Sequence, residues 1–321
     1  MPLRRSNPPR ALRHDDPPRG LRHDIRRGAL CMLAAHLLFT GMSALVKELG
    51  GRIPFVEIMF FRSAFSLPVI GLIVARSGGW RLLRTRRFPG HILRAVTGTL
   101  AQGCSFFALT VLTLAEQTAL GYTTPLFVTI LAIPFLGEQV GRHRWTAVLL
   151  GFCGVLVIAA GQGVFHGVGP VSTLVVLGTA AAVAQGLFSA LTTLLVRQLS
   201  ATESSTTIVL WQSLLMTAFT LLALPFLWVT PGPVDLVLLV LVGLIGGGAQ
   251  WLLTEAYASA QVSALGPYSY AALVWSIALG WLVWGDAPTP WMLAGSALIV
   301  AAGLYILHRE LVRRRHKGNP P

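Results

Sequence analysis

The chain has 321 residues, of which 54% are hydrophobic and only 12% are charged, and its mean hydropathy is +0.67. These values exclude an ordinary water-soluble globular protein. Continuous apolar runs of about 20 residues recur along the chain, which is the length that a helix needs to cross a hydrocarbon layer of about 30 Å. The runs are rich in Leu, Ala, Val and Gly and lack the alternation of a membrane β-barrel strand. The sequence therefore predicts an all-α membrane protein.

The net charge of +13 does not indicate a nucleic-acid partner. Thirteen of the 25 Lys and Arg residues stand in the two terminal segments, next to membrane spans, where they set the orientation of the chain. The three cysteines are odd in number, lie within apolar runs and have no CxxC spacing. Neither a disulfide framework nor a metal site is predicted from them, and no cofactor is expected.

Ten apolar segments are expected to cross the membrane. The basic segment before them, residues 1–28, holds eight Arg and several Pro residues with no clear cleavage site after it. It is predicted to be a disordered cytoplasmic tail and not a cleaved signal peptide. The ten predicted spans are 29–46, 54–75, 92–112, 115–136, 145–161, 171–196, 206–228, 236–258, 262–284 and 291–307.

The distribution of basic residues predicts the orientation of these spans. If the N-terminus is cytoplasmic, the segments on that side carry 22 of the 25 basic residues, whereas the outer loops carry Lys47 and Arg52 and one span contains Arg62. The positive-inside rule therefore places both termini in the cytoplasm of a multi-pass protein of the cell inner membrane.

An internal repeat is visible when the chain is shifted by 148 residues along itself. The shift pairs Gln102 with Gln250 and Tyr122 with Tyr270, and it places Glu138 against Asp286. Chance identity between Leu- and Ala-rich helices is the alternative explanation. Five helices in each unit is an odd number, so the second unit would enter the membrane from the opposite side. Two inverted five-helix repeats are typical of secondary transporters, whose related halves open a central site to each side in turn.

Several motifs resemble the EamA-type members of the drug/metabolite transporter superfamily, which have ten helices in two five-helix repeats. The first unit contains FVEIMFFRSAF and ALGYTTPLFVTILAIPFLGE, and the second contains TEAYASAQVSAL followed by WLVWGD. Asp286 departs from this pattern, because the family usually has Glu there. The resemblance implies EamA-like repeats at residues 29–161 and 171–307, followed by a basic cytoplasmic tail at 308–321.

The same resemblance implies a carrier for a small organic metabolite such as an amino acid, a vitamin such as a flavin, or a nucleotide-like solute. The expected partners are that solute and the lipid bilayer, with proton coupling as a hypothesis and either a monomer or a homodimer as the assembly. A flippase for a lipid-linked substrate is the alternative within this fold. An intramembrane enzyme is the alternative from another class, but the sequence contains no HExxH, nucleophile elbow or P-loop, so an enzyme is not predicted.

Polar residues inside apolar spans are the candidate site residues, because burying them in hydrocarbon is costly. Arg62 lies about 12 Å deep by helix rise, near the middle of the membrane. It could hold a substrate carboxylate or phosphate, or it could bond backbone carbonyls and fix the bundle. Gln102 and Gln250 could hydrogen-bond a substrate from both sides or join their helices. Further candidates for lining the cavity are Tyr122, Tyr270 and Trp275, together with Trp211 and Trp251.

Three titratable residues are candidates for coupling or gating. His36 is the one His predicted well inside a span, where a packing role is the simpler interpretation. Glu57 lies near the outer end of its helix and would most simply be an interfacial carboxylate. Glu255 lies near the inner end, where a protonatable gate and a snorkelling side chain are equally compatible with the sequence.

Proline positions suggest where the spans are interrupted. The fourth span contains Pro125, and the ninth begins with Gly266 and Pro267. Interrupted helices at corresponding places in two halves are a sequence indicator of a transporter site. The carbonyls freed there are candidates to face the cavity.

Overall fold

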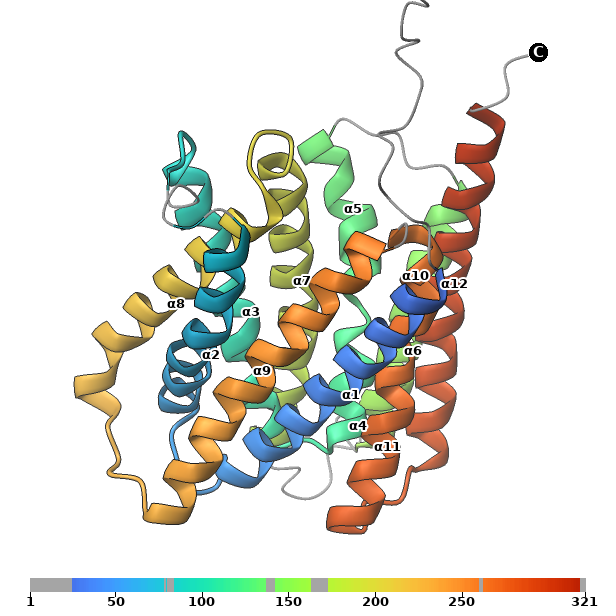
Figure 1. Cartoon of the computed structure of the whole chain (residues 1–321). Helices are drawn as coiled ribbons and strands as arrows, with labels where there is room; N and C mark the ends of the chain where they lie inside the picture. The colour runs from blue at the N-terminus through green and yellow to red at the C-terminus, as the bar shows by residue number, and fades with distance from the viewer. Residues whose placement is uncertain are drawn as a thin grey trace, which may run out of the picture.

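The computed structural model describes residues 25–77, 79, 84–136, 142–162, 173–259 and 262–317. This part of the chain is all-α, as predicted, and its helices stand side by side in one bundle (Figure 1). The helices are α1 (Ile25–Leu49), α2 (Phe55–Ser77), α3 (Phe88–Leu109), α4 (Leu114–Gly121), α5 (Thr124–Leu136), α6 (Arg142–Gly161), α7 (Thr173–Leu199), α8 (Ser205–Leu227), α9 (Pro233–Ser259), α10 (Val262–Ser269), α11 (Ala271–Trp284) and α12 (Pro290–Lys317).

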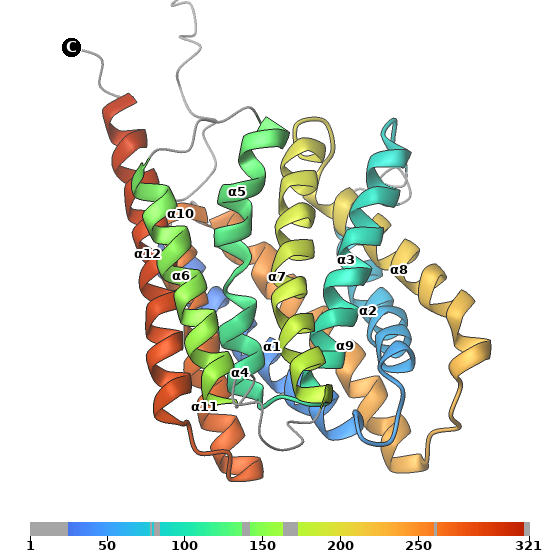
Figure 2. The same ribbon diagram turned by 180° about the vertical axis from the view of Figure 1, so that it is seen from behind.

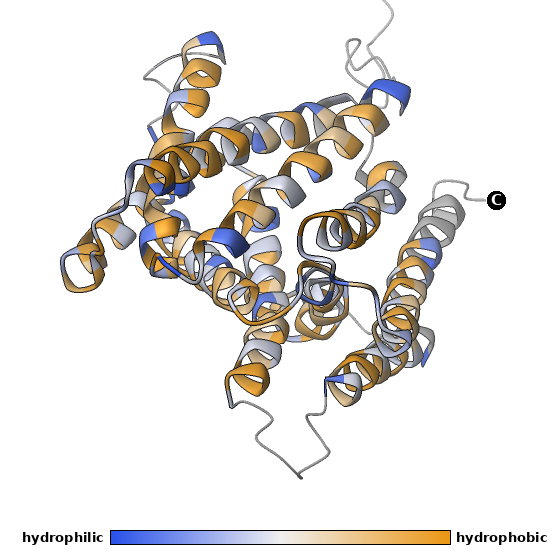
Figure 3. Ribbon diagram, turned by 90° about the horizontal axis from the view of Figure 1, so that it is seen from below, coloured by the Kyte–Doolittle hydropathy of each residue, from blue (hydrophilic) through white to orange (hydrophobic). Residues whose placement is uncertain are grey.

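The apolar stretches confirm a multi-pass membrane protein. Within the described residues, eight helical stretches are long and apolar enough to cross a membrane, and Trp145–Gly161 is a shorter apolar helix. Helices α10 and α11 together cover the remaining predicted span. Hydrophobic residues dominate the helices when the bundle is viewed from one end (Figure 3). Because lipid tails are apolar, large side chains that would be unusual on a soluble surface can face outward here.

The start of α1 and the end of α12 lie at the same end of the bundle (Figure 1). We call this the terminal end and the other the opposite end. The apolar stretch of α12 that is long enough to cross a membrane is Pro290–Arg309, close to the expected span 291–307. The helix itself continues to Lys317, so most of the basic segment 308–321 is helical. Residues 1–24, the connector 163–172 and Glu138 of the LGE motif lie outside the described residues.

Both predicted helix interruptions are present. The fourth span is divided between α4 and α5, and Pro125 stands in the first turn of α5, where its missing N–H costs no helix hydrogen bond. Helix α4 begins with a capping box in which Thr113 and Glu116 bond each other's backbone N–H groups. The ninth span breaks at Tyr270, three residues after Pro267.

The freed carbonyls at these breaks do not match the expectation that they face a cavity. Hydroxyl groups satisfy several of them instead: Thr123 donates to the carbonyl of Leu120, and Tyr122 donates to that of Ser269 at 2.8 Å. In hydrocarbon an unpaired carbonyl is costly, so side-chain donors at the break stabilise the interruption. The last of these bonds also joins the two breaks directly.

Helices from the two halves of the chain interleave. The most extensive packing is between α1 and α9, α3 and α7, α6 and α12, α2 and α8, and α2 and α9. Figure 2 shows α3 beside α7 and α6 beside α12. Each of these pairs takes one helix from each half. The two halves are therefore joined along several seams and do not form two separate bodies.

Helix α6 meets α12 through glycine. A Cβ atom on Gly154 would lie 2.6 Å from the backbone oxygen of Gly295, and one on Gly295 would lie 2.6 Å from the backbone oxygen of Gly154. Small residues at such a seam allow the backbones to approach closely, which is how helices associate where lipid removes the hydrophobic driving force.

We predict that Gly154→Ala destabilises the protein by roughly 1–3 kcal/mol, the usual cost of overpacking, because backbone atoms cannot rotate out of the way. The measurement is the thermal unfolding of the purified protein in detergent. Gly41→Ala is the matched control, since a Cβ there meets nothing within 4 Å and Ala favours the helix. Equal melting temperatures for the two variants would contradict this account of the seam.

Candidate functional site

A polar pocket lies inside the bundle among α2, α3, α8 and α9. Its described lining includes Arg62 and Ser66 of α2, Arg94 of α3, Gln212 of α8 and Gln250 of α9. Its volume is about 40 Å³, room for about three water molecules by the usual measure of about 10–15 Å³ each. Two of the predicted site residues, Arg62 and Gln250, therefore meet in one pocket.

Arg94 is a site residue that the sequence analysis missed, because it was counted among the basic residues of an inner loop. Helix α3 begins at Phe88, four residues before the expected start at Ile92, with Pro89 in its first turn. Arg94 also lies in the predicted span 92–112, but the earlier start places it about two turns inside the helix, where it lines the pocket. His91 stands in the first turn of α3, near the end of that span, and is also buried. The Pro-Gly start of α3 was the sequence signal for both.

The two arginines share the pocket without a carboxylate among its described lining residues. Their guanidinium groups are close enough to repel each other. Several of their nitrogens are buried and make no hydrogen bond within the described part of the chain, namely Nε of Arg62 and Nε and Nη1 of Arg94. Oε1 of Gln212 is likewise buried without a partner. The pocket thus presents unused N–H donors with a net positive charge.

Two glycines make room for these side chains. A Cβ on Gly98 would lie 2.9 Å from Nε2 of Gln212 and 3.1 Å from Nη1 of Arg94, and a Cβ on Gly246 would lie 3.4 Å from Nε of Arg62. Gly98 and Gly246 are 148 residues apart (246 − 98). The sequence repeat therefore corresponds to a structural role at the pocket.

The other candidate residues lie elsewhere in the bundle. Gln102 on α3, His36 on α1 and Trp275 on α11 each have a buried side-chain nitrogen without a hydrogen-bond partner in the described residues. Gln102 is not among the described residues that line the arginine pocket. Its predicted pairing with Gln250 across one pocket is therefore not what the structure shows.

Tyr122 and Tyr270 meet at the two helix breaks, with ring centroids 4.8 Å apart. The hydroxyl of Tyr122 bonds the Ser269 carbonyl. That of Tyr270 packs so closely on Gly303 that a Cβ there would clash with it. These tyrosines hold the breaks together and do not line the arginine pocket.

Of the two remaining tryptophan expectations, the one for Trp251 is wrong. Trp251 is 47% exposed on the outside of the bundle, because it lies about 100° around α9 from Gln250. Trp211 is next to the pocket residue Gln212 but is not among the described residues that line the pocket, and its ring lies 6.1 Å from that of His91. Trp228 and Trp291 are exposed near helix ends, which fits an interfacial belt.

The carboxylates Glu57 and Glu255 lie at opposite ends of the bundle. Glu57 stands in the first turn of α2, near the helix end as expected, and its side chain is buried in the protein and accepts a hydrogen bond of 3.0 Å from the backbone N–H of Val229. It fastens the start of α2 to the segment after α8. Glu255 forms an ion pair with Arg27, which joins the end of α9 to the start of α1 at the terminal end.

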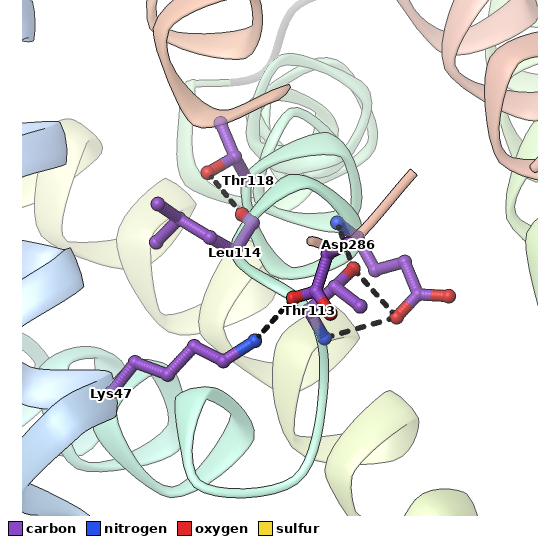
Figure 4. Close-up of polar contacts among 6 residues, drawn as sticks. Lys47, Thr113, Leu114, Thr118 and Asp286 are labelled. Atoms are coloured by element: carbon purple, nitrogen blue, oxygen red, sulfur yellow. Dashed lines mark hydrogen bonds and ion pairs between the residues drawn. The ribbon is translucent and has the colours of Figure 1, made fainter. Parts of the chain in front are cut away.

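A partly buried ion pair closes the opposite end. Nζ of Lys47, in the last turn of α1, lies 2.8 Å from Oδ2 of Asp286, just after α11, and Figure 4 shows the two side chains pointing toward each other beside Thr113 of α4. The ammonium also lies 4.9 Å from the ring centroid of Trp284. Nearby, Arg52 contacts Asp235 at 3.3 Å. Both ion pairs connect the first half of the chain to the second.

Comparisons with known proteins agree with this architecture. The model of the EamA-like transporter family matches the chain twice, over residues 26–160 and 176–308. A solved crystal structure has a TM-score of 0.62 at 22% identity and covers 89% of this chain and 98% of its own. That similarity supports the fold alone.

Curated relatives are similar over nearly the whole chain. The riboflavin transporter of Vibrio cholerae is 31% identical, covering 91% of this chain and 97% of its own. The pseudopaline exporter CntI of Pseudomonas aeruginosa is 30% identical, covering 87% and 95%. The S-adenosylmethionine uptake transporter of Rickettsia bellii is 27% identical, covering 82% and 87%. The chain therefore belongs to the EamA-like transporter family and is a membrane transporter of small metabolites, not an enzyme.

Proposed function

We propose that this transporter carries a small organic anion across the inner membrane by alternating access, and that the substrate's carboxylate or phosphate binds between Arg62 and Arg94. The observation that carries the proposal is the pair of arginines in one pocket with unpartnered N–H donors. The relatives are named for three different substrates, so the pocket chemistry and not the similarity selects the class of solute.

A bound anion would compensate the positive charges of the two guanidinium groups in the pocket. Placing two guanidinium groups together at membrane depth is unfavourable unless a negative charge compensates them. A carboxylate or phosphate can accept paired hydrogen bonds from a planar guanidinium, and such charge-assisted bonds are the strong ones. Gln212 and Gln250 then supply neutral hydrogen-bonding groups to the rest of the solute.

An inverted-repeat arrangement is supported by the correspondence between helices. Helix α4 begins at residue 114 and α10 at 262, and each has eight residues (262 − 114 = 148). A two-fold relation would exchange α1 with α7 and α3 with α9, so that packing of α1 on α9 implies packing of α7 on α3, and both occur. The same relation is seen at the pocket, where Gly98 lies beside Gln212 and Gly246 lies beside Arg62. Gln212 follows Arg62 by 150 residues (212 − 62), close to the repeat spacing.

Alternating access is supported by contacts at both ends of the bundle. Lys47–Asp286 and Arg52–Asp235 join the halves at the opposite end. Thr85 bonds Glu203 at 2.7 Å at the terminal end. The pocket between them is smaller than a metabolite, so the helices must move to admit one. Partly buried polar contacts at the two ends are suited to open in turn.

The distribution of basic residues between the two ends supports an orientation of the protein in the membrane. Basic residues at the terminal end include Arg27, Arg87, Arg142, Arg197 and Arg309, whereas Lys47 and Arg52 stand at the opposite end. By the positive-inside rule the terminal end, with both termini, is cytoplasmic. Proton coupling through His36 stays a prediction, supported by the buried, unpartnered Nε2 of its ring.

The substrate proposal predicts that Arg62→Gln and Arg94→Gln each raise the KM for an anionic solute on the order of tenfold or more, the value of a lost charge-assisted hydrogen bond. The measurement is flux of a pooled metabolite library into proteoliposomes, followed by mass spectrometry, with and without a proton gradient. Arg62→Lys keeps the positive charge but loses the paired donors of the planar guanidinium, so its KM should lie between those of wild type and Arg62→Gln.

Arg142→Gln is the control for these variants, because Arg142 is exposed at the start of α6 and its loss should leave KM unchanged. Saturable flux of a neutral or cationic solute that both pocket variants leave intact would contradict the anion proposal. Absence of flux of every soluble metabolite would favour a lipid-linked substrate instead.

A second prediction concerns the closure at the opposite end. In a background with Cys31, Cys104 and Cys153 replaced by Ser, Lys47→Cys with Asp286→Cys should allow a short bifunctional thiol reagent to stop flux, and a reductant should restore it. The link would hold α1 against α11 and keep that end closed.

The matched control is a link between Arg27→Cys and Glu255→Cys. It also joins the two halves of the chain, but α1 and α9 already pack along their length, so we expect flux to continue. If the first link leaves flux unchanged, Lys47–Asp286 is not a gate. If the control link stops flux, the moving bodies are the two repeats themselves.

A further inference from the structure

A second basic pocket lies at the terminal end of the bundle, away from the arginine site. It is formed where α3 begins and α7 ends, and Arg86, Arg87 and Pro89 line it from one side and Gln198 and Leu199 from the other. Its volume is about 290 Å³, far larger than that of the arginine pocket. Arg86 and Arg87 are both exposed, and Arg87 is held across the pocket by a 3.0 Å bond from Nη1 to the carbonyl of Gln198.

The charge of this pocket has two sources. The two guanidinium groups supply positive charge directly. The pocket also lies at the N-terminus of α3, a helix of 22 residues whose N-cap, Arg87, provides no side-chain cap. The macrodipole of such a helix gives its N-terminal end a partial positive charge, which favours an anion.

Below the pocket, one face of α3 forms an apolar track. Leu93, Val96 and Leu100 are 51%, 38% and 45% exposed. At 100° per residue these three side chains lie within about 40° of the direction of Pro89, which lines the pocket. The track from Pro89 to Leu100 spans 11 residues or about 16 Å, close to half the thickness of a hydrocarbon core of about 30 Å.

We propose that an anionic phospholipid binds here, with its phosphate between Arg86 and Arg87 and an acyl chain along the α3 track. A basic pocket between helices at the membrane surface is the chemistry that selects an anionic headgroup. A free phosphate would use the arginines but not the track, which has the length of one leaflet. Because α3 and α7 come from different halves of the chain, the bound lipid would bridge them.

The test is native mass spectrometry of the purified full chain, with equal amounts of phosphatidylglycerol and phosphatidylcholine added in detergent. We expect selective retention of phosphatidylglycerol, lowered on the order of tenfold in Arg86→Gln/Arg87→Gln, since each basic residue near a membrane surface contributes to anionic-lipid binding. Arg86→Gln alone should give a smaller loss and leaves the Arg87–Gln198 bond in place, and Arg86→Lys should keep most of the binding.

Arg142→Gln is the matched control, because it removes an exposed arginine at the same end outside this pocket, and its lipid binding should equal that of wild type. Equal retention of both lipids, or equal loss in the control and the double variant, would overturn the proposal. Full displacement of the lipid by millimolar inorganic phosphate would also overturn it, by assigning the pocket to a soluble anion. Lipid retention is measured without any transport of solute, so a failure of this proposal can be distinguished from a failure of the proposed transport function.

Discussion

The arginine pocket sets the main physical constraint on this protein. An arginine at membrane depth can be purely structural when its donors bond backbone carbonyls, as the sequence left open for Arg62. The structure instead leaves Nε of Arg62 and two nitrogens of Arg94 buried without partners in the described residues, and the groups repel each other. Such an arrangement is unfavourable in an empty pocket and favourable around an anion. Gly98 and Gly246 lie beside these side chains and leave room for them in the pocket.

The helix breaks provide the second element of the architecture. Interrupting a membrane helix frees backbone groups that lipid cannot satisfy, and this chain satisfies them with threonine and tyrosine hydroxyls. Because Tyr122 reaches the carbonyl of Ser269, each break is stabilised partly by the other. The breaks consequently act as a contact between the two halves, and the proposed anion site lies apart from them, in the pocket between α2, α3, α8 and α9.

Features that depend on composition and on the position of a residue along an apolar run could be predicted from the sequence. Apolar runs located the spans, and the isolated charge of Arg62 located one wall of the pocket. Arg94 escaped because it follows a run of loop arginines, and hydropathy alone does not reveal that Pro89 starts the helix earlier. Gln212 escaped because it matches Arg62 at a shift of 150, not 148. The direction of a side chain around its helix also needs the packing partners, which is why Trp251 was expected inside and lies outside.

The interleaved packing limits which bodies can move. If each repeat moved as one unit, the long seams between α1 and α9 and between α3 and α7 would have to slide, and close-packed seams resist sliding. Units that keep these seams intact combine helices from both repeats. Within such a unit Arg27 and Glu255 stay together. Lys47 of α1 and Asp286, just after α11, lie at a less extensive helix contact than the seam of α1 and α9, and the proposed opening would separate them there. The pocket is lined by helices of both seams, α9 of one and α3 of the other, so movement of one unit against the other would change the spacing of Arg62 and Arg94 and hence the affinity of the proposed anion site.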